Sequence, residues 1–200
     1  MNTKETILTA AQDLFSRSGY EAVGIQQICT AAGITKPSLY YHFGNKETLL
    51  AAVARDATSA FITALAAAPS PSDPGTEEEI RYSGDLVSDV RALFVAVLWF
   101  SREQAARFQI ILQMLYPPQG GVFGQVGTPQ LQRIHSALVQ FFTAAAGGHG
   151  NLIGKEQFLA TVFLGHAIAL SMFVTEEHPG VTADSPTVVL AAQTFLYGIF

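Results

Sequence analysis

Residues 25–50 read IQQICTAAGITKPSLYYHFGNKETLL, and this stretch decides how the N-terminal part of the chain folds. The apolar side chains at its start recur every three or four residues, as on one face of a helix: Ile25, Ile28, Cys29 and Ala32. Gly33 then provides the residue type that tolerates a left-handed conformation at a helix end. We therefore predict a short helix that begins at Ile25 and ends at Gly33.

A second short helix is predicted directly after that glycine. Thr35 can cap its N-terminus, and Pro37 suits its first turn because an N–H there would have no partner within the helix. We expect Leu39 and Phe43 to face inward. Two short helices joined by a tight, glycine-containing turn form a helix-turn-helix over residues 25–44, which places its second helix in the major groove of DNA.

Helices are also predicted on both sides of this motif. Apolar spacing indicates a helix over residues 3–17, which Gly19 ends, and Asn45 can cap a longer helix that reaches about Ala67. The segment PSPSDPGTEEE at residues 69–79 has the composition of a loop or linker.

Helical patterns return after this segment and continue to the end of the chain. No run of strict apolar alternation bounded by turn residues indicates a strand, and no internal repeat is visible. We predict an all-α protein of about nine helices, with an N-terminal helix-turn-helix domain at 1–62 and a second helical domain at 63–200. The helices predicted in the second domain are 85–100, 102–115, 129–146, 155–177 and 186–199.

Composition limits the possible functions. The formal net charge of −5 argues against a protein that coats nucleic acid or anionic membranes non-specifically, since such binding scales with the number of cations. The single cysteine, Cys29, and an N-terminus unlike a secretory signal favour the cytoplasm. Residues 158–175 carry no charge, but the chain lacks basic flanks and aromatic belts, so we predict a helix buried in protein and no membrane association.

Three blocks in unbroken register give the N-terminal region a family resemblance: AAG at 31–33, TKPSLYYHF at 35–43 and NKETLL at 45–50. Together with the preceding helix, about the first 60 residues resemble the DNA-binding domain of the tetracycline-repressor (TetR) family. The resemblance implies a homodimeric transcription regulator that binds a palindromic operator and responds to a small-molecule effector. We expect a repressor, and activation stays open.

The resemblance also assigns roles within residues 25–50. Lys36 and Pro37 open the recognition helix, where a lysine can donate to guanine and a proline can touch a thymine methyl group. Tyr40 matches a position that reaches a base edge or phosphate, and Lys46 matches a phosphate-binding lysine at a positive helix end. Gln26 takes a place often held by arginine. The predicted DNA-binding residues are Gln26, Thr35, Lys36, Pro37, Ser38, Tyr40, Tyr41, His42 and Lys46.

The sequence departs from the family pattern at two positions. Gly24 stands where a serine or threonine usually caps the helix and touches phosphate, and Cys29 stands where alanine is usual. Residues 1–50 hold as many acids (Glu5, Asp13, Glu21, Glu47) as bases (Lys4, Arg17, Lys36, Lys46). Because few cations are available to release counterions, we predict a shallow dependence of DNA affinity on salt.

The aromatic residues of the C-terminal domain indicate an apolar effector pocket, which the family resemblance places there. His166 is a polar group in an otherwise apolar helix and needs a partner, which a ligand can supply. The predicted effector is a small apolar or aromatic molecule, with the pocket residues Trp99, Phe100, Phe108, Met114, Tyr116, Phe163 and His166.

The last two helices, 155–177 and 186–199, are apolar on more faces than a monomer can bury. Gly165 and Ala169, four residues apart, allow close helix contact. Similar helices form the dimer interface in the family, so we expect a homodimer through these two segments.

Two other classes of function stay open at this stage. One is a small-molecule carrier with a vestigial helix-turn-helix, which the neutral DNA-facing region makes worth considering. The other is a helical enzyme, but no Ser-His-Asp set, paired carboxylates, metal-ligand spacing or glycine-rich phosphate loop supports it. We therefore expect no catalytic residue, no metal and no cofactor.

Overall fold

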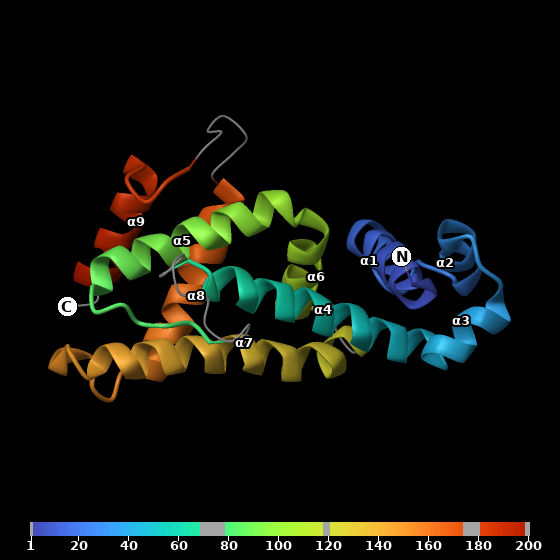
Figure 1. Cartoon of the computed structure of the whole chain (residues 1–200), viewed down its shortest axis with the longest axis horizontal. Helices are drawn as coiled ribbons and strands as arrows, with labels where there is room; N and C mark the ends of the chain where they lie inside the picture. Colours follow the sequence, from blue (N-terminus) through green and yellow to red (C-terminus); the bar gives the residue numbers. More distant parts are fainter. Residues whose placement is uncertain (1, 69–78, 118–120, 174–180, 199–200) are drawn as a thin grey trace. The chain divides into compact units, whose positions relative to one another are not determined.

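The structure is a computed structural model that describes residues 2–68, 79–117, 121–173 and 181–198. These residues form nine α-helices, one short 3₁₀ turn and no strand, which confirms the predicted all-α class (Figure 1). In chain order the elements are α1 (Thr3–Ser18), α2 (Ile25–Ala32), α3 (Lys36–Phe43), α4 (Lys46–Ala66), α5 (Leu86–Glu103), α6 (Ala105–Leu115), α7 (Val122–Ala146), the 3₁₀ turn (Gly150–Leu152), α8 (Glu156–Phe173) and α9 (Pro186–Tyr197).

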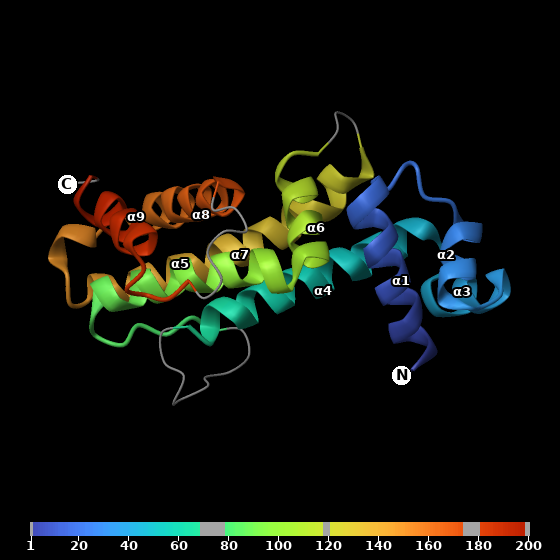
Figure 2. The ribbon, with the colours of Figure 1, turned by 90° about the horizontal axis from the view of Figure 1, so that it is seen from above.

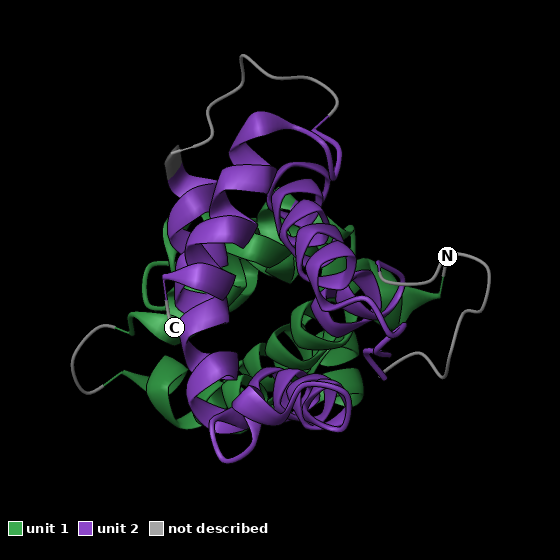
Figure 3. Cartoon of the chain, turned by 90° about the vertical axis from the view of Figure 1, so that its left-hand side faces the viewer, with its two compact units in different colours: residues 1–60, 105–132 green, residues 61–104, 133–200 purple. Residues whose placement is uncertain are grey.

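The chain forms two compact units, coloured separately in Figure 3. The first unit contains residues 1–60 and 105–132, and the second contains residues 61–104 and 133–200. Helix α6 thus belongs to the same compact unit as the N-terminal helices, whereas the two domains predicted from the sequence meet at residue 62. Those predicted domains are defined by function, and their boundary stays a prediction.

Helix α1 is the centre of the first unit, where it packs on both α2 and α6. Its inward face is fully buried at Ile7, Ala11 and Phe15. A side chain distant in sequence satisfies its C-terminus, since Gln113 Nε2 donates to the carbonyl oxygens of Phe15 at 3.1 Å and Ser16 at 3.2 Å. Helix α6 therefore both covers and caps α1.

The second unit is built on α5, which packs on α8 and α9, and these two also contact each other (Figure 2). Its core contains a cluster of four buried phenylalanines, Phe94, Phe142, Phe163 and Phe195. The ring centroids of Phe94 and Phe163 lie 4.9 Å apart, and those of Phe163 and Phe195 lie 5.7 Å apart. Tilted and edge-on contacts of this kind add to the stabilisation that comes from burial.

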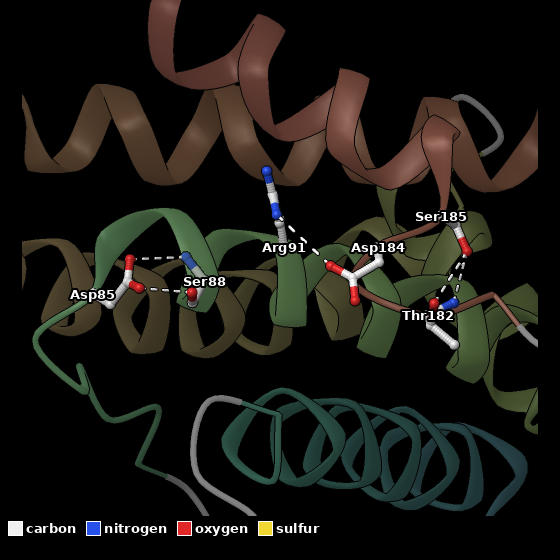
Figure 4. Close-up of polar contacts among 6 residues, drawn as sticks. All are labelled: Asp85, Ser88, Arg91, Thr182, Asp184 and Ser185. Carbon is white, nitrogen blue, oxygen red and sulfur yellow. Dashed lines mark hydrogen bonds and ion pairs between the residues drawn. The ribbon is translucent and has the colours of Figure 1, made fainter.

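Polar contacts fix the start of two helices in the second unit (Figure 4). Asp85 caps α5, because its carboxylate accepts hydrogen bonds from the backbone N–H and the hydroxyl of Ser88. Before α9, the backbone N–H of Thr182 donates to Ser185 Oγ at 2.9 Å. Between these helices Arg91 Nη1 lies 3.9 Å from the Asp184 carboxylate.

The predicted start of α7 was wrong. The helix begins at Val122, seven residues before the expected start at Pro129, which lies inside it. Proline cannot donate to the carbonyl of Gln125, but both residues are exposed, so water can serve that carbonyl and the helix continues. Helix α8 begins at Glu156, close to its predicted start, and the predicted residues 174–177 lie outside the described residues.

In the described part of the chain, one helix, α4, is long and apolar enough to cross a membrane. Half of the apolar stretch of this helix is buried inside the protein, and the helix carries the charged residues Arg55 and Asp56. The Asp56 carboxylate pairs with Arg107 Nε of α6 at 2.8 Å. Core helices of water-soluble proteins pass the same test, so α4 gives only weak evidence of a membrane span.

Candidate nucleic-acid interface

The turn between α2 and α3 is fixed by Gly33, as predicted. Its φ of 65° and ψ of 35° are left-handed, a conformation that costs other residues energy. The next backbone N–H, that of Ile34, donates to the carbonyl of Cys29 at 3.0 Å and closes the end of α2. Helix α3 therefore leaves α2 in one defined direction.

Buried side chains hold α3 in place from behind. Leu39 and Phe43 are buried, as predicted, and they share the core with Ile28 and Cys29 of α2. The buried Leu49 belongs to the start of α4. This apolar face fixes the rotation of α3 about its own axis, so the opposite face is determined as well.

The opposite face of α3 is exposed and polar. Tyr41 is 86% exposed and Tyr40 is 47% exposed, far more than a tyrosine needs for its hydroxyl to reach water. The rings of Tyr41 and His42 make an edge contact at 5.1 Å. Of the other predicted DNA-binding residues on α2 and α3, Gln26, Thr35, Lys36 and Pro37 are exposed, and Ser38 and His42 are partly buried.

The predicted cap of α3 is only half right. Thr35 occupies the N-cap position and Pro37 lies in the first turn, but the Thr35 hydroxyl makes no capping hydrogen bond. The first backbone N–H groups of α3 are therefore not capped by this side chain. Such groups at a helix start can donate to a phosphate oxygen together with an exposed hydroxyl.

Gly24 leaves the start of α2 without a side-chain cap, as the departure from the family pattern led us to expect. The side chain of Gln27 bends back instead, and its Oε1 accepts a hydrogen bond from the Gly24 N–H. That bond satisfies one backbone donor within the protein and removes it from contact with a ligand.

Lys46 lies at the start of α4, where Asn45 Oδ1 accepts the N–H of Thr48 at 2.7 Å and caps the helix as predicted. The Lys46 ammonium group lies 4.0 Å from the centroid of the Tyr20 ring. Burial lowers the pKa of Lys46, and attraction to Glu21 partly opposes this shift. Tyr20 therefore holds the ammonium group by a cation–π contact that the sequence did not reveal.

Sequence reasoning also missed Lys4. Its ammonium group lies 6.0 Å from the centroid of the Phe43 ring, at the outer limit of a cation–π contact. The residue is exposed on the first turn of α1 and places a third lysine close to the C-terminal end of α3. The contact could not be predicted from the sequence, because Lys4 and Phe43 are far apart along the chain.

The structure separates the residues predicted for the effector pocket. Phe108, Met114 and Tyr116 belong to the first unit, and Trp99, Phe100, Phe163 and His166 belong to the second. Phe100, Phe108, Met114 and Phe163 are buried, whereas Trp99 is 51% exposed and Tyr116 is 77% exposed.

Phe163 and His166 are brought together, because both rings contact Phe94, at 4.9 and 5.2 Å. Phe100 instead packs on Phe61 at 5.1 Å. Burial lowers the pKa of His166 and so favours its neutral form. His166 is thus the polar group beside the phenylalanine cluster of the second unit.

The fold and the exposed face of α3 define a helix-turn-helix protein. The family model for bacterial regulatory proteins of the tetR family matches residues 7–53. A curated relative, the HTH-type transcriptional regulator RutR of Escherichia coli (strain K12), is 39% identical over 64 residues, which cover 32% of this chain and 30% of RutR. The matched region is therefore less than a third of that relative's length.

Solved structures match along nearly the whole chain. A putative tetR family transcription regulator from Shewanella sp. PV-4 has a TM-score of 0.73 at 20% identity, covering 99% of this chain and 98% of that one. The crystal structure of AibR in complex with isovaleryl coenzyme A and operator DNA has a TM-score of 0.65 at 21% identity, covering 96% and 97%. Residues 7–53 thus match the tetR family model, and the chain as a whole shares its fold with these solved structures.

Proposed function

We propose that this protein is a homodimeric transcription regulator of the cytoplasm that binds a palindromic operator and releases it when a small apolar or aromatic effector binds. The observation that carries the proposal is the two-sided character of α3. Leu39 and Phe43 are buried behind it, while Tyr40, Tyr41 and Lys36 are exposed in front. Two tyrosine rings exposed on one short helix leave apolar area in contact with water, and a binding partner that covers them would recover the free energy of burial.

The exposed groups suit the edges of bases and the DNA backbone. Lys36 can donate to guanine acceptors, and the ring of Tyr41 can contact a thymine methyl group or stack along the sugar-phosphate backbone. The Thr35 hydroxyl and the start of α3 provide neutral donors for phosphate. Lys46 adds a charge at the start of α4, at a position fixed by Tyr20.

Dimerisation through α8 and α9 is supported by large apolar side chains on their exposed faces. Phe158 and Met172 of α8 are 59% and 63% exposed, and Leu190 and Tyr197 of α9 are 64% and 68% exposed. A second copy of the chain that covers these side chains would give an isologous interface. In the dimer, two recognition helices would read half-sites about one turn of DNA apart, roughly 34–36 Å.

We place the effector in the second unit, beside Phe163 and His166. The neutral imidazole of His166 can donate or accept one hydrogen bond, and the adjoining phenylalanine cluster offers an apolar surface. The related fold of AibR, solved with an acyl coenzyme A and operator DNA, supports a ligand-responsive role. Repression is the outcome expected when the ligand releases DNA.

The test is binding of the purified protein to the DNA upstream of its own gene. We expect saturable binding that random DNA of equal length does not displace. Tyr41→Ala should weaken this binding by about fivefold or more, since a good base contact is worth about 1–3 kcal/mol. The matched control is Ile153→Ala, another exposed apolar side chain, in the second unit. Binding no tighter than to random DNA would favour the small-molecule carrier instead.

A further inference from the structure

The first unit contains a cleft that the proposed function does not use. It has a volume of about 380 Å³ and lies between the segment after α1 and the facing ends of α6 and α7. Tyr20, Glu21 and Ala22 line one side, and Gln113, Tyr116 and Phe123 line the other. Its volume falls in the range of small-molecule sites, roughly 300–1,000 Å³.

The walls of the cleft are mostly aromatic and apolar. Tyr116 is largely exposed, and Tyr20 and Phe123 meet edge to face at 6.3 Å. An exposed tyrosine ring beside a cleft gives a flat ligand an apolar surface on which to stack. The cleft therefore favours a planar aromatic molecule over a flexible chain.

Two side chains of the cleft, Gln113 and Glu21, offer hydrogen-bond acceptors, beside hydroxyl groups that can donate or accept. Gln113 uses its amide nitrogen to cap α1, so its Oε1 is turned away from those carbonyls and accepts no hydrogen bond within the described part of the chain. Glu21 adds an exposed carboxylate, and none of the described residues that line the cleft is a lysine or an arginine. Anions are disfavoured in this setting, and ligands with an N–H donor are favoured.

We infer that this cleft binds a small planar aromatic compound with an N–H donor, neutral or cationic, whose ring lies against Tyr20 and Tyr116 and whose donor meets Gln113 or Glu21. The site is separate from the effector site proposed in the second unit. Binding itself needs only the cleft and does not depend on the DNA-binding function.

Occupancy of the cleft would act on Lys46 through Tyr20. The Tyr20 ring lies 5.5 Å from Phe15, 6.3 Å from Phe123 and 4.0 Å from the Lys46 ammonium group. A ligand that displaces or tilts this ring removes the support of the ammonium group. This coupling rests on the proposed role of Lys46 in DNA binding.

The binding test uses three probes with the same ring: indole, tryptamine and indole-3-acetate. Each is titrated into the ¹⁵N-labelled full chain, and amide shifts of Gly19 and Gly121, which line the cleft, are followed. A Kd on the order of 0.1–1 mM is expected for indole, a ring of about ten non-hydrogen atoms. Tryptamine should bind about tenfold more tightly than indole-3-acetate.

Two variants in which an alanine is replaced by tryptophan control the experiment. Ala22→Trp adds an indole ring inside the cleft and should abolish the shifts, whereas Ala105→Trp, at an equally exposed position of the first unit outside the lining, should preserve them. The absence of saturable shifts, equal shifts in both variants, or tighter binding of the anion would each overturn the proposal.

The coupling is tested separately, with operator DNA. Saturating tryptamine should weaken DNA binding by the wild-type protein several-fold and leave the Ala22→Trp variant unchanged. If the wild-type protein binds tryptamine in the cleft but binds no specific DNA, the proposed function fails while the site stands. If specific DNA binding is unaffected by tryptamine in the cleft, the coupling through Tyr20 is wrong.

Discussion

Lys36 and Lys46 differ in how their charges are held, although both are predicted to bind DNA. Lys36 is exposed on the first turn of α3 and can adjust to its target. Lys46 is partly buried, and its ammonium group is fixed over the ring of Tyr20. A cation held in place loses less side-chain entropy when it meets a phosphate than a free one does.

The contribution of Tyr20 can therefore be measured through Lys46. We expect Tyr20→Leu to weaken operator binding by about two- to fivefold, because the cation–π contact is worth roughly 0.5–1 kcal/mol at an exposed site. The measurement is a fluorescence-anisotropy titration with operator DNA. In the Lys46→Ala background, Tyr20→Leu should have no further effect, and a full additional loss would show that Tyr20 acts by another route.

His166 should make the stability of the second unit depend on pH. Burial lowers its pKa in the folded state below the usual value of 6.5, so the unfolded state binds more protons at mildly acidic pH. Stability from this residue is complete above pH 6.5 and declines as pH falls through 6.5 toward the lower folded value. Urea unfolding at pH 7.5 and 5.5 should show a smaller loss for His166→Gln than for wild type, and an equal loss in both proteins would contradict this origin.

At the scale of the element, local patterns predicted what depends on neighbours in sequence. The cap at Asn45, the left-handed end at Gly33 and the burial of Leu39 follow from residues within one helical turn. The contacts of Gln113 with α1 did not, because the partners are 97 and 98 residues apart. The exposure of Trp99 was not predicted either, because in a helix that is apolar on most faces the sequence does not indicate which face is exposed to solvent.

Gly33 gives a direct test of the helix-turn-helix geometry. Gly33→Ala should destabilise the first unit by about 1–2 kcal/mol, because a left-handed conformation strains any residue with a Cβ atom. Gly124→Ala is the matched control, since Gly124 lies within α7 with no positive φ and its new Cβ would make only ordinary contacts. Differential scanning calorimetry measures the midpoint temperature of unfolding of both variants. Equal midpoints would mean that the left-handed conformation of Gly33 is not needed for the turn between α2 and α3.

At the scale of the whole molecule, the sparse positive charge limits the electrostatic share of DNA binding. A dimer would present four lysines from positions 36 and 46, so the slope of log K against log salt should be about −3.6, at roughly 0.9 per neutralised phosphate. Titrations between 50 and 200 mM salt measure it. A slope near −8 would require cations outside this set, and Lys4, close to Phe43, is the first to replace.

The dimer is testable through its exposed apolar side chains. Leu190→Lys places a charge on α9 where 64% of the side chain is exposed, so the monomer should fold normally while dimerisation weakens. Sedimentation equilibrium should show a shift toward monomer, with operator affinity falling in parallel. Ile153→Lys, at a similarly exposed residue outside α8 and α9, should stay dimeric. A dimeric Leu190→Lys protein would place the interface elsewhere.

Trp99, the only tryptophan in the chain, has a consequence for spectroscopy. The residue belongs to the second unit, and the tyrosines of the recognition helix belong to the first. Emission excited at 295 nm therefore reports on one unit alone, while far-ultraviolet circular dichroism reports on the helices of both. Coincident denaturation curves from the two signals would mean that both units melt as one cooperative block, and separate curves would mean that each has its own melting transition.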